Sequence, residues 1–365
     1  MPVDGSLEDA LEGAGAAPAA VRAGSRRWAV LRAALTVAVV AAVCWAALAE
    51  RGAVLTALRA LRAPAPGWVV AAMAAEVASM GLYARMQRRL LRGAGTTVPL
   101  HRAVALAYAA HSMSITLPGG PLVSTVYNYR RMRGFGADST VAAWCTAASG
   151  LLSTLGLAAL TAVVGVAAAV DDTDDVLPVA GVLAAVLLLA AAARLLRRRP
   201  DLTAALRGTL RDRVGSRLPD RARQRGAEAG VWLGRLLRVR IPPADLAAAS
   251  LFSVANWVAD GLCLALCCRA LGAEVGLVPL ALTYIAGMTA AGLPIVPGGL
   301  GTVDGALALG LVAAGTPTAS ALAVVVLYRL ISLVLIGGVG WVLWLAGRRP
   351  EKSTRRTMPG RSARR

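Results

Sequence analysis

Long apolar runs recur along this chain, and they constrain its fold more than any other feature. Runs of about 20 residues, the length at which a helix crosses about 30 Å of hydrocarbon, cover 28–49, 66–86, 139–170, 176–196, 244–270 and 318–346. Backbone groups inside a bilayer must find hydrogen-bond partners within the chain, and helices provide them. We therefore expect an all-α, polytopic membrane helix bundle with six full spans.

Two further apolar regions, 103–129 and 277–315, are each interrupted by a Pro-Gly-Gly break. The breaks consist of Pro118, Gly119 and Gly120 in the first region and of Pro297, Gly298 and Gly299 in the second. Proline removes an amide donor and glycine lets the chain turn sharply, so a helix should end there. The segments beyond the breaks, 121–129 and 301–315, are shorter than the roughly 20 residues of a full crossing. Both regions are predicted to be re-entrant hairpins, and ordinary helical hairpins with short loops are the alternative.

The two breaks lie 179 residues apart, and the same shift relates other elements of the chain. It places the run at 244–270 on the run at 66–86, and the run at 318–346 on the run at 139–170. Each half, about 28–170 and 176–346, then consists of two spans, a hairpin and a third span. Three crossings are an odd number, so the second half would be inserted upside down. Broken helices at matching positions of inverted repeats indicate a transporter-type site near the middle of the bilayer.

The arginines predict the orientation of the chain, because cytoplasmic loops carry the excess of Lys and Arg. The chain has 39 Lys and Arg against 20 Asp and Glu, and its arginines gather before the first span, around the first hairpin, in the loop 197–243 and in the tail 347–365. We therefore expect both termini in the cytoplasm. The polar segment 1–27 is predicted to be disordered, and 28–346 to form the transmembrane domain.

The basic loop 197–243 contains thirteen arginines and four acidic residues. Its segment "VWLGRLLRVR" at 231–240 places apolar side chains on one helix face beside Arg235 and Arg238, a pattern that suits a helix lying on an anionic membrane surface. A nucleic-acid interface would show stacking aromatic positions or a recognisable module, and the sequence has neither. We expect membrane lipids as partners, anionic ones in particular, and no nucleic acid.

Ionisable residues within the apolar segments are few, and each is a candidate site residue because charge is costly in a bilayer. They are Glu76, Asp260, Asp304 and Arg329, accompanied by the polar residues His111, Asn256, Tyr284 and Tyr328. Glu76, Ser79 and Tyr83 share one helix face through steps of three and four residues, and so do Asn256 and Asp260. The 179-residue shift places Glu76 beside Asn256. Both faces are therefore predicted to point toward a common interior.

Arg329 lies about a third of the way into its span and holds its charge permanently. We expect an acidic partner for it, from among Asp260, Asp304 and Glu76. Such a pair either joins two helices or takes part in binding an anionic headgroup, and the two roles are compatible.

The turn "PGGLGTVDG" at 297–305 predicts a half-helix over 303–315 with Thr302 as its N-cap. Asp304, in the first turn, is expected to stabilise the helix start, and a response to protons is the alternative. A helix that starts inside the membrane directs unsatisfied amides at its surroundings and favours a phosphate. The first hairpin offers a counterpart, with Ser124 or Thr125 as the cap. The predicted substrate-binding residues are Pro118, Gly119, Gly120, Arg130, Pro297, Gly298, Gly299, Thr302, Asp304 and Arg329.

The sequence indicates no cofactor and no catalytic residue. Its cysteines lie inside apolar segments, without the paired spacing of a structural zinc site or a disulfide framework: Cys44, Cys145, Cys263, Cys267 and Cys268. A nucleotide-binding loop and a nucleophile pair are absent as well. We expect no metal, and no enzymatic activity.

Three segments carry a resemblance to a known family. They are "LPGG" at 117–120 followed by "YNYRRMRGFG", "PGGLGTVDGALAL" at 297–309, and "LYRLISLVLIGGVGW" at 327–341. They resemble the lysylphosphatidylglycerol synthase transmembrane region, the flippase-like family of bacterial and archaeal membrane proteins, and Arg329 matches the Tyr-Arg pair of that family. The resemblance covers roughly 28–346, without the soluble aminoacyl-transfer domain, so synthase activity is not expected. It implies a bacterial plasma-membrane protein, from a family whose membrane region moves aminoacylated phospholipid between leaflets when it is fused to that soluble domain.

We therefore expect an integral membrane protein that binds an anionic phospholipid or a lipid-linked headgroup and helps to move it across the bilayer. A second copy of the chain and a separate lipid-modifying enzyme are the further partners considered. The alternative is a membrane-embedded enzyme or accessory subunit that acts on a lipid-linked substrate, with Asp304 or Glu76 as acid or base. A scaffold whose basic loop recruits partners to anionic lipid is a third hypothesis.

Overall fold

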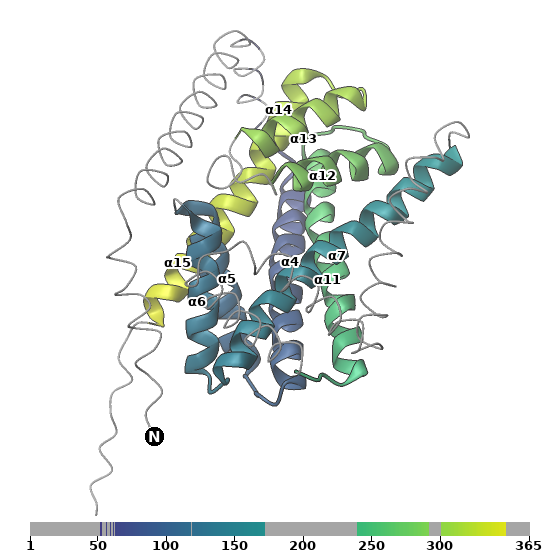
Figure 1. Cartoon of the computed structure of the whole chain (residues 1–365). Helices are drawn as coiled ribbons and strands as arrows, with labels where there is room; N and C mark the ends of the chain where they lie inside the picture. Colours follow the sequence, from purple (N-terminus) through teal and green to yellow (C-terminus); the bar gives the residue numbers. More distant parts are fainter. Residues whose placement is uncertain are drawn as a thin grey trace, which may run out of the picture. The chain divides into compact units, whose positions relative to one another are not determined.

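The computed structural model describes residues 63–117, 119–171, 239–291 and 301–347, together with the single positions 52, 56, 59 and 61. All regular secondary structure in these ranges is helical, as expected for an all-α membrane protein. The helices are α4 (Pro66–Gly93), α5 (Leu100–Thr116), α6 (Gly120–Gly134), α7 (Ser139–Asp171), α11 (Pro243–Ala270), α12 (Leu277–Ala291), α13 (Thr302–Ala313), α14 (Thr318–Arg329), the π-helical turn η3 (Leu330–Leu335) and α15 (Ile336–Ala346). Figure 1 shows their order along the chain.

Four helices in the described ranges are long and apolar enough to cross a membrane. They are α4, α7 over Ser139–Ala168, α11, and the continuous helix from Thr318 to Ala346 that α14, η3 and α15 form together. These are the spans predicted at 66–86, 139–170, 244–270 and 318–346. The other two predicted spans, 28–49 and 176–196, lie outside the described residues, as do the loop segment 197–238 and the tail from residue 348.

Both regions with a Pro-Gly-Gly break consist of two short helices, as predicted. α5 and α6 are separated by Leu117 to Gly119, and α12 and α13 by residues 292–301. α12 has 15 residues and α13 has 12, fewer than the roughly 20 residues of a full crossing. Helix, break and helix therefore recur in both halves of the chain, and re-entrant insertion stays a prediction.

The described chain divides into two compact units. The first contains the start of α4 up to Val70 and the segment Leu264–Tyr328, with the end of α11, α12, α13 and α14. The second contains Ala71–Cys263 and the segment from Arg329, with most of α4, α5, α6, α7, most of α11, η3 and α15. Each unit is described by itself below.

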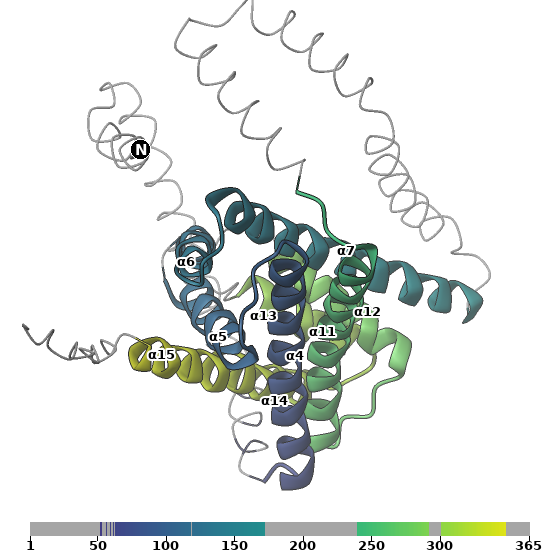
Figure 2. The ribbon, with the colours of Figure 1, turned by 90° about the horizontal axis from the view of Figure 1, so that it is seen from below.

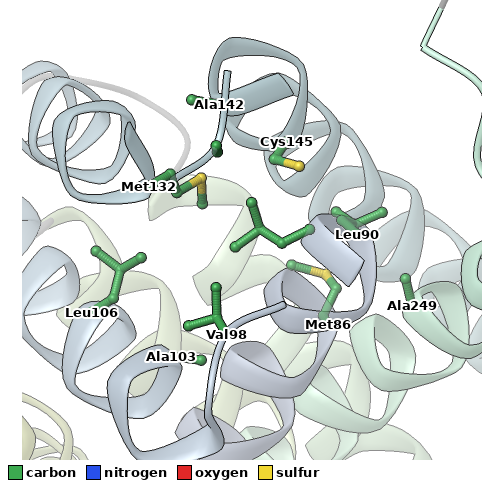
Figure 3. Packing of buried hydrophobic residues seen from close by; sticks show 11 residues of the cluster. Met86, Leu90, Val98, Ala103, Leu106, Met132, Ala142, Cys145 and Ala249 are labelled. Carbon is green, nitrogen blue, oxygen red and sulfur yellow. The ribbon is translucent and has the colours of Figure 1, made fainter. Parts of the chain in front are cut away.

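The apolar core of the second unit lies where α4, α5, α6, α7 and the start of α11 meet. Figure 3 labels nine of its buried side chains: Met86, Leu90, Val98, Ala103, Leu106, Met132, Ala142, Cys145 and Ala249. Leu91 and Ala137 belong to the same cluster. Small residues alternate with Leu and Met in this cluster, so the helices approach one another closely. Lipid tails are as apolar as these side chains, so moving the side chains out of the lipid gains little. Close van der Waals packing is therefore what holds membrane helices together.

A second close contact in this unit joins α5 to α15, which lie side by side (Figure 2). Ser112 is fully buried, and its hydroxyl lies 2.9 Å from the carbonyl oxygens of both Tyr108 and Gly337, to which it donates. Gly340 lies so near that a Cβ atom there would collide with the Ser112 hydroxyl and the Tyr108 carbonyl. The absence of a side chain at Gly340 is therefore what lets the two backbones approach.

In the first unit, α12 packs against α13 (Figure 1). Each of the two helices has a glycine that makes room for a larger side chain of the other helix. A Cβ atom at Gly287 would lie 2.6 Å from a methyl group of Leu307, and one at Gly310 would lie 2.7 Å from the side chain of Thr283. This reciprocal fit fixes the two short helices as a compact pair.

Candidate functional site

The most concentrated polar site in the second unit lies between α4 and α11, which run side by side (Figure 2). The Ser79 hydroxyl donates to the Asn256 side-chain oxygen at 3.1 Å, and the Arg89 guanidinium contacts the Asp245 carboxylate at 3.2 Å. From the first contact to the second, the residue number rises on α4, from Ser79 to Arg89, and falls on α11, from Asn256 to Asp245. The two helices are therefore antiparallel. The polar faces of α4 and α11, which the sequence predicts to point toward a common interior, are in contact at Ser79 and Asn256.

Glu76 and Asp260 come together at this interface. The carboxyl group of Glu76 shares side-chain hydrogen bonds with Asp260 and with the Cys263 thiol. Glu76 is only 3% exposed, and its Oε2 atom is buried without a hydrogen-bond partner among the described residues. A hydrogen bond between two carboxyl groups requires a proton on one of them, because a carboxylate only accepts.

Two residues of α5 also face this acidic pair. Tyr108, which is 5% exposed, interacts electrostatically with Glu76, and His111 interacts with Asp260. We call Glu76, Asp260, Asn256, Ser79, Cys263, Tyr108 and His111 the polar cluster. Among the described residues, no group of three or more His, Cys, Asp or Glu side chains is arranged to hold a metal ion.

The polar face of α4 continues to a residue that the sequence analysis missed. The side-chain amide of Gln87 donates to the Tyr83 hydroxyl at 3.4 Å and to the Asn128 side-chain oxygen on α6 at 3.5 Å. Gln87 is 1% exposed and its Oε1 atom has no partner in the described structure. Its position four residues after Tyr83 was the signal that could have identified it, because steps of four residues keep to one helix face.

The first helix break is tightly built. Gly119 takes the left-handed conformation, with φ of 68°, and is the N-cap of α6. Gly120 has no room for a side chain, because a Cβ atom would collide with the Ser114 carbonyl oxygen. The prediction of Ser124 or Thr125 as the cap is wrong, because these left-handed and close-packed glycines start the helix earlier. Pro118 lies outside the described residues.

The start of α6 does not offer the unsatisfied amides that we expected of a half-helix. The Gly120 amide donates to the Leu117 carbonyl at 2.8 Å, and the amides of residues 122 and 123 donate to the Gly119 carbonyl at 2.9 and 3.2 Å. Pro121 has no amide hydrogen. Every amide of this first turn is therefore accounted for, and an anion would have to be held by other groups.

Basic groups lie at the opposite end of α6. Arg130 is exposed, and Arg131 places its guanidinium over the Phe135 ring, 5.6 Å from the ring centre. Arg133 interacts electrostatically with Asp138, which precedes α7. The Thr140 amide donates to Asp138 at 2.9 Å, and this backbone hydrogen bond is the main reason why the pKa of the Asp138 carboxyl lies below its ordinary value.

At the second break, the structure corrects the prediction that Thr302 is the N-cap. α13 begins at Thr302, and its N-cap is Gly301, whose φ is 86°. The Gly301 amide donates to the Asp304 carboxylate at 2.7 Å, so Asp304 stabilises the helix start, as expected. A glycine reaches this φ without strain, which moves the helix start one residue earlier. Pro297, Gly298 and Gly299 lie outside the described residues.

Tyr328 and Arg329 end α14. Tyr328 is 3% exposed and Arg329 is half-buried, and both side chains are engaged with other groups. The π-helical turn η3 follows directly, and such turns are frequent at functional sites. The acidic partner proposed for Arg329 stays a prediction.

Comparison with known protein families identifies a match over most of the chain. The family model described as the lysylphosphatidylglycerol synthase TM region matches residues 30–340. The chain matches no curated protein at a significant level.

Proposed function

The chain belongs to the lysylphosphatidylglycerol synthase TM region family, and from this premise we propose that it binds an anionic phospholipid or a lipid-linked headgroup and helps to move it across the bilayer. The observation that carries the proposal is the polar cluster between α4 and α11, where Glu76 is almost fully buried and keeps an unpartnered oxygen. Polar and ionisable groups inside membrane helices are costly and mark the paths of substrates or ions.

A polar headgroup needs such groups, because crossing hydrocarbon would otherwise remove its hydrogen bonds with water. The polar cluster provides hydroxyl, amide and carboxyl groups on two neighbouring helices. The Ser79 hydroxyl donates to the Asn256 side-chain oxygen. A headgroup could replace either partner of this hydrogen bond as it passes. The exposed Arg130 on α6 is suited to attract an anionic headgroup before it leaves the membrane surface.

The inverted repeat is part of the proposal, and three observations in the structure support it. α6 and α13 end close to left-handed glycines, Gly136 and Gly315, which are 179 residues apart. α7 and α14 begin at Ser139 and Thr318, again 179 residues apart. Within the second unit, α4 and α11, which this shift relates, run antiparallel, as counterparts in an inverted repeat should.

We further propose that the protein lies in the plasma membrane of a bacterium with both termini in the cytoplasm, as the distribution of arginines predicts. A cysteine introduced at the exposed Arg131 should then react with a membrane-impermeant reagent from the cytoplasmic side only. Reaction from the outer side alone would contradict this orientation.

The function can be tested in liposomes that contain the purified chain and fluorescent phosphatidylglycerol. Dithionite quenches the label in the outer leaflet, so lipid that moves outward during the assay adds to the quenched fraction. We expect the native chain to raise this fraction above that of protein-free liposomes, and Arg329→Gln and Asp304→Asn to lower the rate. Glu274→Gln, at an exposed position, is the matched control and should leave the rate unchanged.

The outcomes of this assay separate the hypotheses. A native chain that is folded and moves no labelled lipid would contradict the proposal. If that chain instead converts a lipid-linked substrate, the enzyme hypothesis is correct. If Arg329→Gln and Asp304→Asn both move lipid at the native rate, the protein moves lipid without the predicted site.

A further inference from the structure

The polar cluster contains a pair of acidic side chains that the movement of a lipid headgroup does not by itself explain. Glu76 on α4 and Asp260 on α11 share a hydrogen bond, in two helices long and apolar enough to cross the membrane. An acidic pair would repel an anionic headgroup if both groups were ionised. Its presence beside a path for anions therefore needs a separate explanation.

The geometry of the pair indicates that it holds a proton. Two carboxylates have no hydrogen to share, so the bond between Glu76 and Asp260 exists only when at least one is protonated. Two like charges in an apolar interior would be strongly unfavourable. The second oxygen of Glu76 is buried without a partner, so it is free to carry the proton and to donate a hydrogen bond, or to accept one when ionised.

The groups around the pair provide a route by which a proton could reach it. Cys263, which is on α11, lies beside Glu76. Tyr108 and His111 on α5 interact with Glu76 and Asp260. His111 is half-buried, and an imidazole can accept a proton on one nitrogen and release one from the other. A half-buried imidazole that interacts with Asp260 is therefore suited to pass protons to the pair.

We propose that Glu76 and Asp260 form a proton-binding site, and that its protonation is coupled to the passage of the anionic headgroup. The inference rests on the proposed function for the identity of the passing group, but the proton site itself does not depend on it. The proton comes from the aqueous phase and returns to it, so the only bond that forms and breaks is an O–H bond. When both carboxyl groups are protonated, the pair is neutral and can donate a hydrogen bond to a passing phosphate.

This coupling predicts the direction of the pH dependence. Movement of an anionic lipid should become faster as the pH falls, by up to about tenfold per pH unit while the fully protonated pair is the minor form. Glu76→Gln keeps the size of the side chain and removes one titrating group. Its rate should therefore depend much less on pH than the native rate.

The proton site can be measured without any transport. Infrared difference spectra of the full chain in phosphatidylglycerol liposomes, recorded through a pH titration in H2O and in D2O, distinguish protonated carboxyl groups, whose carbonyl band shifts in D2O, from the ester carbonyl groups of the lipid. We expect a band that titrates in the native chain, is lost in Glu76→Gln and persists in the control Glu274→Gln. If Glu76→Gln keeps every titrating carboxyl band of the native chain, Glu76 binds no proton and the proposal is wrong.

The coupling is then tested by the dithionite assay at several pH values in the same liposomes. A native rate that rises with acidity and a flat rate in Glu76→Gln are the expected results. Equal pH dependence in the two proteins would contradict the coupling. Asp260→Asn provides a second variant if Glu76→Gln fails to fold, and Glu76→Asp should restore a titrating band. If the infrared band is present but the native chain moves no lipid, the proposed function fails and the proton site stands.

Discussion

Replacing Gly340 by alanine should disrupt the contact between α5 and α15. Gly340 is buried, and the added methyl group would collide with the Ser112 hydroxyl and with the carbonyl oxygen of Tyr108. A side-chain hydroxyl can rotate away, but a helix carbonyl cannot. The helices would therefore have to separate, and the hydrogen bond from Ser112 to the Gly337 carbonyl would lengthen or break.

The expected destabilisation follows from three contributions. Overpacking at a tight contact costs about 1–3 kcal/mol, and the lost hydrogen bond costs about 0.5–1.5 kcal/mol. Alanine recovers about 0.5–1 kcal/mol because it favours the helix more than glycine does. We expect Gly340→Ala to lower the free energy of unfolding by about 2 kcal/mol, within a range of about 0.5–4 kcal/mol.

Gly338 on the same helix provides the matched control. It is exposed, and a Cβ atom there would meet no atom within 4 Å, so Gly338→Ala should be neutral or slightly stabilising. Reversible unfolding in sodium dodecyl sulfate, followed by circular dichroism, measures both variants. Ser112→Ala in the Gly340→Ala background should restore part of the loss, because it removes one of the two colliding groups. Equal stability of Gly340→Ala and Gly338→Ala would refute the close contact.

Three further predictions use the same unfolding measurement. Asp138→Ala should lower stability by about 0.5–1 kcal/mol at pH 7 through loss of the α7 N-cap. Because the pKa of Asp138 is lowered in the folded state, this difference should disappear as the pH falls below its ordinary value of 3.8, and persistence in acid would contradict it. Gln87→Met should lower stability by about 1–2 kcal/mol, because the Tyr83 hydroxyl and the buried Asn128 oxygen lose their donor while only one unpartnered oxygen is removed; unchanged stability would show that these hydrogen bonds contribute nothing. Asp245→Asn should cost less than about 1 kcal/mol and lose its effect at high salt, because its partner Arg89 is 38% exposed, and a cost that salt does not change would contradict an ordinary surface ion pair.

Long apolar runs predicted the described spans closely, because a membrane helix must be apolar along its length. The prediction for 139–170 differs by one residue from α7, which ends at Asp171. α4 continues to Gly93, beyond the predicted 86, because three arginines in its last two turns interrupt the apolar run around the buried Leu90 and Leu91. One of them, Arg89, is held by Asp245 on α11, and a contact that distant in sequence leaves no local trace.

The polar cluster was predictable in part. Steps of three and four residues identified the faces that carry Glu76 and Asp260, because helix geometry alone decides which residues share a face. The pairing of Gln87 with Asn128 was missed, because it depends on how α4 packs against α6. The N-caps Gly119 and Gly301 were missed for a related reason. Each is set by the positive φ of the glycine, which the side chains of the neighbouring residues do not reveal.

The central claim is that a lipid headgroup passes the polar cluster, and the natural cysteines allow a direct measurement. Cys263 lies beside Glu76, whereas Cys145 is equally buried but sits in the apolar core. Two variants that each retain one of these cysteines, with alanine at the other four positions, can be placed in liposomes with a phospholipid that carries a thiol-reactive group on its headgroup. Mass spectrometry of the intact chain then measures the covalent lipid adduct. The account predicts an adduct at Cys263 that forms several-fold faster than at Cys145. Equal rates at the two cysteines, or an adduct at Cys145 alone, would contradict it.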